Sequence, residues 1–115
     1  MTPAYDLAAI QRLAATPGRV GFRRSLTIRV VCERLGVAEP AARRLMRDVI
    51  GRLTPDDYAE TLRAIEPPAD VYGWIDGQGR GWYIKFAIDA TGDLFVVSFH
   101  PPTSPLRTRA GVVRM

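Results

Sequence analysis

The feature that most constrains this chain is a change of hydrophobic period at Pro67-Pro68. Before these prolines, apolar residues recur every three or four positions, as in amphipathic helices, whereas after them apolar and polar residues alternate, as in strands with one buried face. The alternation predicts strands at residues 70–75, 81–89 and 93–100. Glycine-containing turns at 76–79 and 91–92 separate them and suit tight hairpins. The sequence therefore predicts an α+β fold, in which N-terminal helices pack on a C-terminal antiparallel β-meander.

The helical part has its own start and stop signals. Helices are predicted at 5–15, 27–35, 40–50 and 54–65, with a short strand at 19–22. Gly36 follows the second helix, where a left-handed C-terminal cap is common. The last helix is predicted from Thr54-Pro55-Asp56-Asp57, because a capping hydroxyl, a proline and two acids all favour a helix N-terminus. Its end is expected at Pro67.

The length of 115 residues indicates one domain. We divide it into a mainly helical part (1–66), the meander (69–100) and a basic, proline-containing tail (101–115). Cys32 is the only cysteine, so no internal disulfide can form and a reducing compartment fits. No apolar run approaches the roughly 20 residues that cross a bilayer. The expectation is a cytoplasmic protein with no membrane partner.

The formal net charge of +4 makes nucleic acid the first class of partner to consider. Lys85 is the only lysine, and all other basic residues are arginines, which contact phosphate in a bidentate manner. An arginine-rich codon bias would produce the same composition. Charge alone therefore leaves the partner open.

Strand register predicts a polar patch on the meander. Closing the second hairpin through 91–92 pairs Tyr83 with His100, Lys85 with Ser98 and Phe86 with Val97. One face then carries Tyr83, Lys85, Ser98 and His100. The opposite, buried face is predicted to hold Ile84, Phe86, Ile88, Phe95, Val97 and Phe99. Directly opposed side chains lie about 5 Å apart at Cβ, so the four polar groups form one patch.

The first hairpin extends this patch. With Ile75 opposite Arg80, the count brings Tyr72 beside Tyr83 and Asp70 beside Lys85. A purely structural interpretation remains open, in which Lys85 pairs with Asp70, Tyr83 packs on Tyr72 and His100 only marks the end of a strand.

The functional interpretation of the patch is metal-free RNA cleavage. His100 would be the general acid or base, Lys85 would stabilise the charged transition state, and Tyr83 would stack on a base or donate a proton. The predicted RNA contacts are Arg80, Arg107, Arg109 and Tyr72. His100 is the only histidine, and no cluster of His, Cys and carboxylates has the spacing of a metal site. We therefore expect neither a metal nor a small-molecule cofactor.

A competing interpretation is a helix-turn-helix around residues 27–50. Gly36 would lie in the turn, and Arg43, Arg44 and Arg47 would lie on the second helix, where basic residues meet DNA. The pattern is permissive, because many helix pairs joined through glycine match it. A non-enzymatic nucleic-acid-binding or protein-interaction module is therefore the alternative.

Several motifs in order carry a family resemblance. They are Tyr5-Asp6-Leu7, Leu35-Gly36, Leu53-Thr54-Pro55-Asp56-Asp57-Tyr58, Asp70-Val71-Tyr72, Tyr83-Ile84-Lys85-Phe86 and Val96-Val97-Ser98-Phe99-His100. Over about residues 5–102, the chain resembles the MqsR family of mRNA-interferase toxins. The resemblance implies a RelE-like fold, endoribonuclease activity on mRNA in a type II toxin–antitoxin system, and a cognate antitoxin as protein partner. It places Tyr83 and His100 at active-site positions of that family.

The chain departs from the family pattern at two places. Tyr58-Ala59-Glu60-Thr61 stands where the family has Phe-Tyr-Lys-Ser, so that Glu60 replaces an active-site lysine, and Pro68-Ala69 replaces Trp-Gln. His100 stands where the family often has lysine. Histidine titrates near neutral pH and would restore acid/base capacity there.

Overall fold

The computed structural model describes residues 2–114 and contains, within that range, three α-helices and a five-stranded sheet. The helices are α1 (Leu7–Ala14), α2 (Arg29–Leu35) and α3 (Glu39–Arg52). The sheet strands are β1 (Val20–Phe22), β2 (Tyr58–Leu62), β3 (Ala69–Ile75), β4 (Gly81–Ile88) and β5 (Leu94–His100). Their spatial order is β1-β5-β4-β3-β2, and only the β1–β5 pair is parallel. The predicted α+β class and the β3–β4–β5 meander are confirmed.

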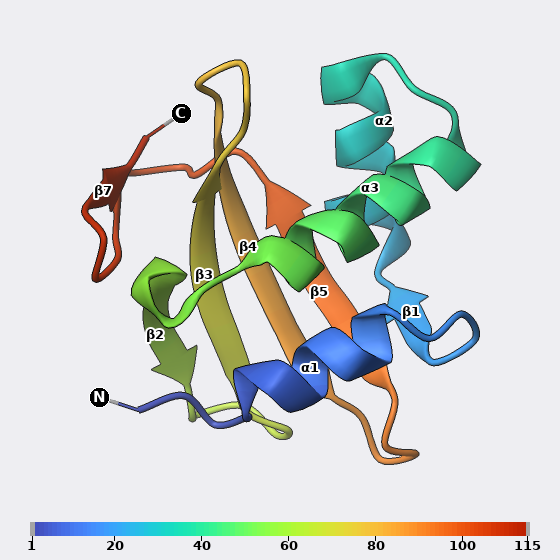
Figure 1. The fold of residues 1–115 in the computed structure, drawn as a ribbon, viewed down its shortest axis with the longest axis vertical. Coiled ribbons are helices and arrows are strands. Elements are labelled where there is room, and N and C mark those ends of the chain that lie inside the picture. The colour runs from blue at the N-terminus through green and yellow to red at the C-terminus, as the bar shows by residue number, and fades with distance from the viewer. Residues whose placement is uncertain (1, 115) are drawn as a thin grey trace.

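The helices form one layer across one face of the sheet (Figure 1). Ala42, Met46 and Ile50, spaced by four residues on α3, are fully buried against that face together with Ile10 of α1. The sheet contributes Ile84, Phe86, Leu94, Val96 and Phe99 to the same core. Burying each large aliphatic or aromatic side chain contributes about 1.5–3 kcal/mol relative to exposure, so this interface dominates the stability of the fold. Within residues 2–114, no helix has the length and hydrophobicity that crossing a membrane requires.

The predicted pairing of β4 with β5 is correct at one end and wrong at the other. Tyr83 lies opposite His100 and Lys85 opposite Ser98, as the sequence predicts. Phe86, however, pairs with Val96, because a bulge inserts one extra residue in β5. The bulge inverts the alternation beyond it, so Leu94 and Val96 are buried in the core in place of the predicted Phe95 and Val97, which are partly exposed.

The predicted register of β3 with β4 is wrong by one residue. Ile75 pairs with Gly81, and Tyr72 with Ile84. The cause is the turn, because the Asp76 amide bonds to the Arg80 carbonyl and the carboxylate accepts the amides of Gln78 and Arg80, while Gly79 has a φ of 79°. This turn needs five residues where the prediction used four. Asp70 and Tyr72 consequently face the helices, away from Tyr83 and Lys85.

The predicted helix at 54–65 is wrong. Thr54 and Asp57 form the expected capping box, but the helix stops after one 3₁₀ turn (Pro55–Asp57). The chain then becomes β2, in which Tyr58 is buried opposite Tyr72 with the two rings edge to face at 5.6 Å. Pairing with β3 provides hydrogen-bond partners for the backbone of β2 and also buries the Tyr58 side chain. Tertiary packing therefore outweighs the local signal for a helix that starts at Thr54.

The chain after β5 forms a hairpin of two short strands, β6 (Leu106–Arg107) and β7 (Val112–Val113). It packs on the sheet face that the helices leave open, where Leu106 and Val113 contact Val71 in a second, smaller apolar cluster. Two glycines make room for it. A Cβ on Gly73 would lie 2.8 Å from Val113 Cγ2, and one on Gly81 would overlap the Arg114 carbonyl oxygen.

Candidate active site

The candidate active site lies on the sheet face turned away from the helices, here called the distal face. Strand pairing places Tyr83, Lys85, Ser98 and His100 on this face, as predicted. It adds Glu60, because Glu60 lies opposite Val71 and Val71 lies opposite Lys85. Opposed residues of antiparallel strands share a face, so all five side chains lie on the distal face, where Ser98 is buried and the other four are partly exposed.

Tyr83 and His100 form a stacked pair. Their ring centroids are 5.0 Å apart and the ring planes are inclined by only 10°. The Nδ1 atom of His100 lies 2.8 Å from the carbonyl oxygen of Pro101. A carbonyl can only accept a hydrogen bond, so Nδ1 carries the proton, and in the neutral ring Nε2 keeps its lone pair. The imidazole is therefore held in the tautomer of a general base.

Tyr83 keeps its phenol proton over a wide pH range. Its side chain is partly buried, and burial raises the pKa of the Tyr83 phenol above the usual value, with a further increase from the negative charge of Glu60. At neutral pH the phenol is consequently protonated and is able to donate a hydrogen bond.

Lys85 supplies positive charge beside this pair, two residues along β4 and opposite Ser98. It is partly exposed, and no other residue in the described part of the chain forms an ion pair or hydrogen bond with it. The predicted structural partner, Asp70, is fully buried on the helical side and accepts hydrogen bonds from the backbone amides of Ala4 and Tyr5 and from the Thr61 hydroxyl. Pairing of Lys85 with Asp70 is therefore wrong as an alternative explanation of the patch.

The predicted RNA contacts divide between several places. Arg107 and Arg109 lie at the β2 side of the sheet, where with Tyr58, Ala59 and Thr108 they line a hollow of about 260 Å³. The Arg109 guanidinium carbon lies 5.2 Å from the centroid of the Tyr58 ring.

Two predicted contacts are not on the distal face. Tyr72 is 1% exposed and stacks on Phe86 in the core, and burial raises its pKa to about 12. Arg80 lies on the helical side, where it forms an ion pair with Asp76 at 2.9 Å. The predicted position of Tyr72 follows from the incorrect β3–β4 register, whereas Arg80 has the even parity of Ile84 and belongs to the helical side in either register.

Glu60 is the site residue that reasoning from the residue pattern missed. It was assigned to a helix, so it was never placed beside Tyr83. The sequence motifs carry a signal, because the family that they resemble is expected to have an active-site lysine at position 60.

The helix pair expected for a helix-turn-helix is present, with Gly36 at a φ of 65° between α2 and α3. Two of its three candidate arginines are bound within the protein. Arg43 contacts Glu39 and lies over the Phe22 ring, and Arg47 donates to the carbonyl of Ala14. Arg44 is exposed. The second helix thus presents little free basic surface for reading DNA bases.

Among residues 2–114, no group of three or more His, Cys, Asp or Glu side chains is placed to hold a metal ion. Neither a scan against models of known protein families nor a search of curated proteins found a match to this chain.

Proposed function

We propose that this chain is a metal-independent endoribonuclease that cleaves mRNA as the toxin of a type II toxin–antitoxin system, a divergent relative of the MqsR family with a RelE-like fold. The observation that carries the proposal is the stacked Tyr83–His100 pair, with the His100 Nε2 lone pair free and Lys85 on the same face. A base, a proton donor and a cation on one surface are the groups that RNA transesterification requires.

The reaction follows from these roles. His100 Nε2 takes the proton of a ribose 2′-hydroxyl, and the resulting oxygen attacks the adjacent phosphorus. The bond from phosphorus to the 5′-oxygen breaks, and this oxygen takes a proton donated by the Tyr83 phenol. The products are a 2′,3′-cyclic phosphate and a 5′-hydroxyl end. Lys85 stabilises the additional negative charge on the phosphorane, where a fixed cation is most effective.

Substrate and partners are supported by charge and resemblance. The formal net charge of +4 favours RNA, and Arg107 and Arg109 would hold the phosphate backbone beside strand β2. The MqsR resemblance supports a cytoplasmic toxin that a cognate antitoxin neutralises.

The test is incubation of the purified protein with a mixed-sequence RNA in EDTA, followed by mapping of the fragment ends. Wild type should produce discrete cuts with 2′,3′-cyclic phosphate ends. His100→Ala should slow cleavage by roughly 10²-fold or more, the usual effect of removing a general base, and Tyr83→Phe should slow it by about tenfold or more. Circular dichroism of each variant would check the fold. A folded wild type that leaves the RNA intact would overturn the proposal of an isolated ribonuclease.

A second candidate is binding of RNA or a partner without cleavage, and Glu60 favours it. This carboxylate stands on the distal face where the resembled family has a lysine, so it weakens the attraction of phosphate to the site. A wild type that retains a labelled RNA on a filter without cutting it would support this candidate. DNA reading by α3 would instead require that Arg43→Ala with Arg44→Ala abolish binding to a DNA duplex.

A further inference from the structure

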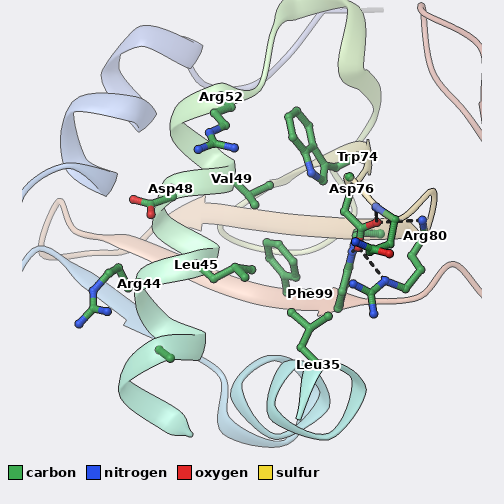
Figure 2. A pocket seen from close by; sticks show the side chains of 14 residues that line it. Leu35, Arg44, Leu45, Asp48, Val49, Arg52, Trp74, Asp76, Arg80 and Phe99 are labelled. Atoms are coloured by element: carbon green, nitrogen blue, oxygen red, sulfur yellow. Dashed lines mark hydrogen bonds and ion pairs between the residues drawn. The ribbon is translucent and has the colours of Figure 1, made fainter. Parts of the chain in front are cut away.

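A second site lies on the opposite side of the sheet. It is a groove of about 400 Å³ between α3 and the β3–β4 hairpin (Figure 2). Leu45 and Val49 of α3 form one wall, and Trp74 of β3 forms the other. Grooves of this size hold small ligands, and an aliphatic wall facing an indole suits a flat, aromatic group. None of the five polar residues of the distal face lines this groove.

The floor of the groove is rigid. Trp82 is 2% exposed, because Phe99 packs against its ring at 5.2 Å between centroids and the Arg34 guanidinium lies 4.4 Å from its centroid. Its indole N–H donates to Asp76, which is also bonded to Arg80. The Trp82 ring is therefore almost completely covered by protein atoms, whereas Trp74 is only partly buried and part of its ring can contact a ligand.

The groove has unmatched positive charge. Its lining carries three arginines (Arg44, Arg52 and Arg80) and two aspartates (Asp48 and Asp76). Asp76 is already bonded to Arg80, and Figure 2 shows Arg44 and Asp48 directed to the side of α3 away from the hairpin. Of the residues that the structure describes, none forms an ion pair or hydrogen bond with Arg52.

Two guanidiniums, those of Arg34 and Arg80, lie close enough to interact near the hairpin end of the groove. Burial, and then the like charge of Arg80, lower the pKa of Arg34. Asp76 is a carboxylate that offsets these two guanidiniums there. At the other end of the groove, an anionic group beside Arg52 would gain a charge-assisted hydrogen bond.

We propose that this groove binds a nucleotide, with the base between Val49 and Trp74 and the phosphate on Arg52. The same chemistry is offered by a free mononucleotide and by the phosphorylated end of an RNA strand. The proposal is independent of the ribonuclease proposal, because the residues involved lie on the other face of the sheet.

Tryptophan fluorescence tests it directly, because both tryptophans of the chain line this groove. Titration with AMP should give a saturable change in emission. Arg52→Gln and Trp74→Leu should each weaken AMP by about tenfold, through loss of a charged hydrogen bond and of stacking. Arg12→Gln removes the same charge from an exposed position on α1 and should leave the affinity unchanged. Inorganic phosphate should bind more weakly than AMP because it has no base to stack.

Further titrations distinguish a free nucleotide from the phosphorylated end of an RNA strand, and both from a peptide ligand. A 5′-phosphorylated 2′-O-methyl trinucleotide, which cannot be cut by attack of a 2′-hydroxyl, should bind through the same residues. Tighter binding than AMP would identify a strand end, and weaker binding a free nucleotide. No saturable change up to about 5 mM AMP would overturn the proposal, as would equal weakening by Arg12→Gln. Preference for an acidic, leucine-containing peptide over AMP would overturn it in favour of a protein partner.

Discussion

Asp76 shows how one carboxylate determines the geometry of a whole hairpin. It accepts hydrogen bonds from the Trp82 indole, the Arg80 guanidinium and two turn amides. Burial alone would raise the pKa of Asp76, but these hydrogen bonds outweigh it and lower the value from 3.8 to about 2. The ionised form is therefore favoured by folding.

This pKa predicts a pH dependence of stability. A lowered folded-state pKa contributes stability above pH 3.8, which is lost as the pH falls towards 2. The size is about 2 kcal/mol at 1.36 kcal/mol per pH unit. Asp76→Asn should lose about that amount in urea unfolding at pH 6, and its stability should fall less steeply than that of wild type from pH 5 to pH 2. Asp48→Asn is the matched control and should behave as wild type, since the Asp48 side chain is exposed. Equal slopes for Asp76→Asn and wild type would contradict the assignment.

At this scale the sequence predicts part of the candidate active site. Tyr83, Lys85 and His100 come together because positions 83 and 85 share a face of any strand, and the β4–β5 register holds at that end. Tyr72 does not join them, because the extra turn residue set by Asp76 inverts the parity of β3. Arg80 does not join them because it has the even parity of Trp82 and Ile84, which face the helices. Hydrophobic periodicity does not show that the side chain of Asp76 sets the number of residues in the turn.

At the scale of elements, β5 is the clearest departure from a regular strand. The bulge between its two halves makes Val96 a core residue and leaves Val97 partly exposed, although a regular strand predicts the reverse.

Alanine substitution distinguishes the two registers. Val96→Ala should destabilise by about 2 kcal/mol, because a fully buried side chain is lost and a cavity remains. Val97→Ala should cost less than about 1 kcal/mol. Urea unfolding of both variants measures the difference, and the opposite order would mean that β5 is unbulged.

Most elements were predictable, and the exception is instructive. α1, α2, α3 and the three meander strands follow from period, caps and turns. The strand after Asp57 was not predictable in this way. The capping residues do begin a helix there, but it ends after one 3₁₀ turn. Residues 58–62 form a strand because they pair with the edge of β3. Since β3 comes later in the chain, this pairing leaves no mark on the local hydrophobic pattern of residues 58–62.

At the scale of the whole molecule, the sheet has the helices on one face and the β6–β7 hairpin on part of the other (Figure 1). The sequence predicts the first layer, but it describes residues 101–115 only as a tail. The second layer depends on the absence of side chains at Gly73 and Gly81, which sequence alone does not distinguish from ordinary turn or strand glycines.

Gly81→Ala should release this hairpin. The new Cβ would overlap the Arg114 carbonyl oxygen and lie 2.9 Å from Val113 Cγ1, so the C-terminal strand must shift. We expect a loss of about 1–3 kcal/mol and faster trypsin cleavage at Arg107 and Arg109, followed by mass spectrometry.

Gly51→Ala is the matched control for this change. No atom lies within 4 Å of its added Cβ, and it is in α3, so stability should hold or rise by about 0.5–1 kcal/mol. If Gly81→Ala resists trypsin as well as Gly51→Ala does, the hairpin is not held by this contact.

Strand β4 belongs to both candidate sites at once. Trp82 forms the floor of the groove and Tyr83 stacks on His100, and a single peptide bond joins the two residues. Even-numbered positions from 82 to 88 face the helices, and odd-numbered positions face the other way. A substitution at an even-numbered position therefore alters the helical side and one at an odd-numbered position alters the distal face, although both lie in the same eight-residue strand.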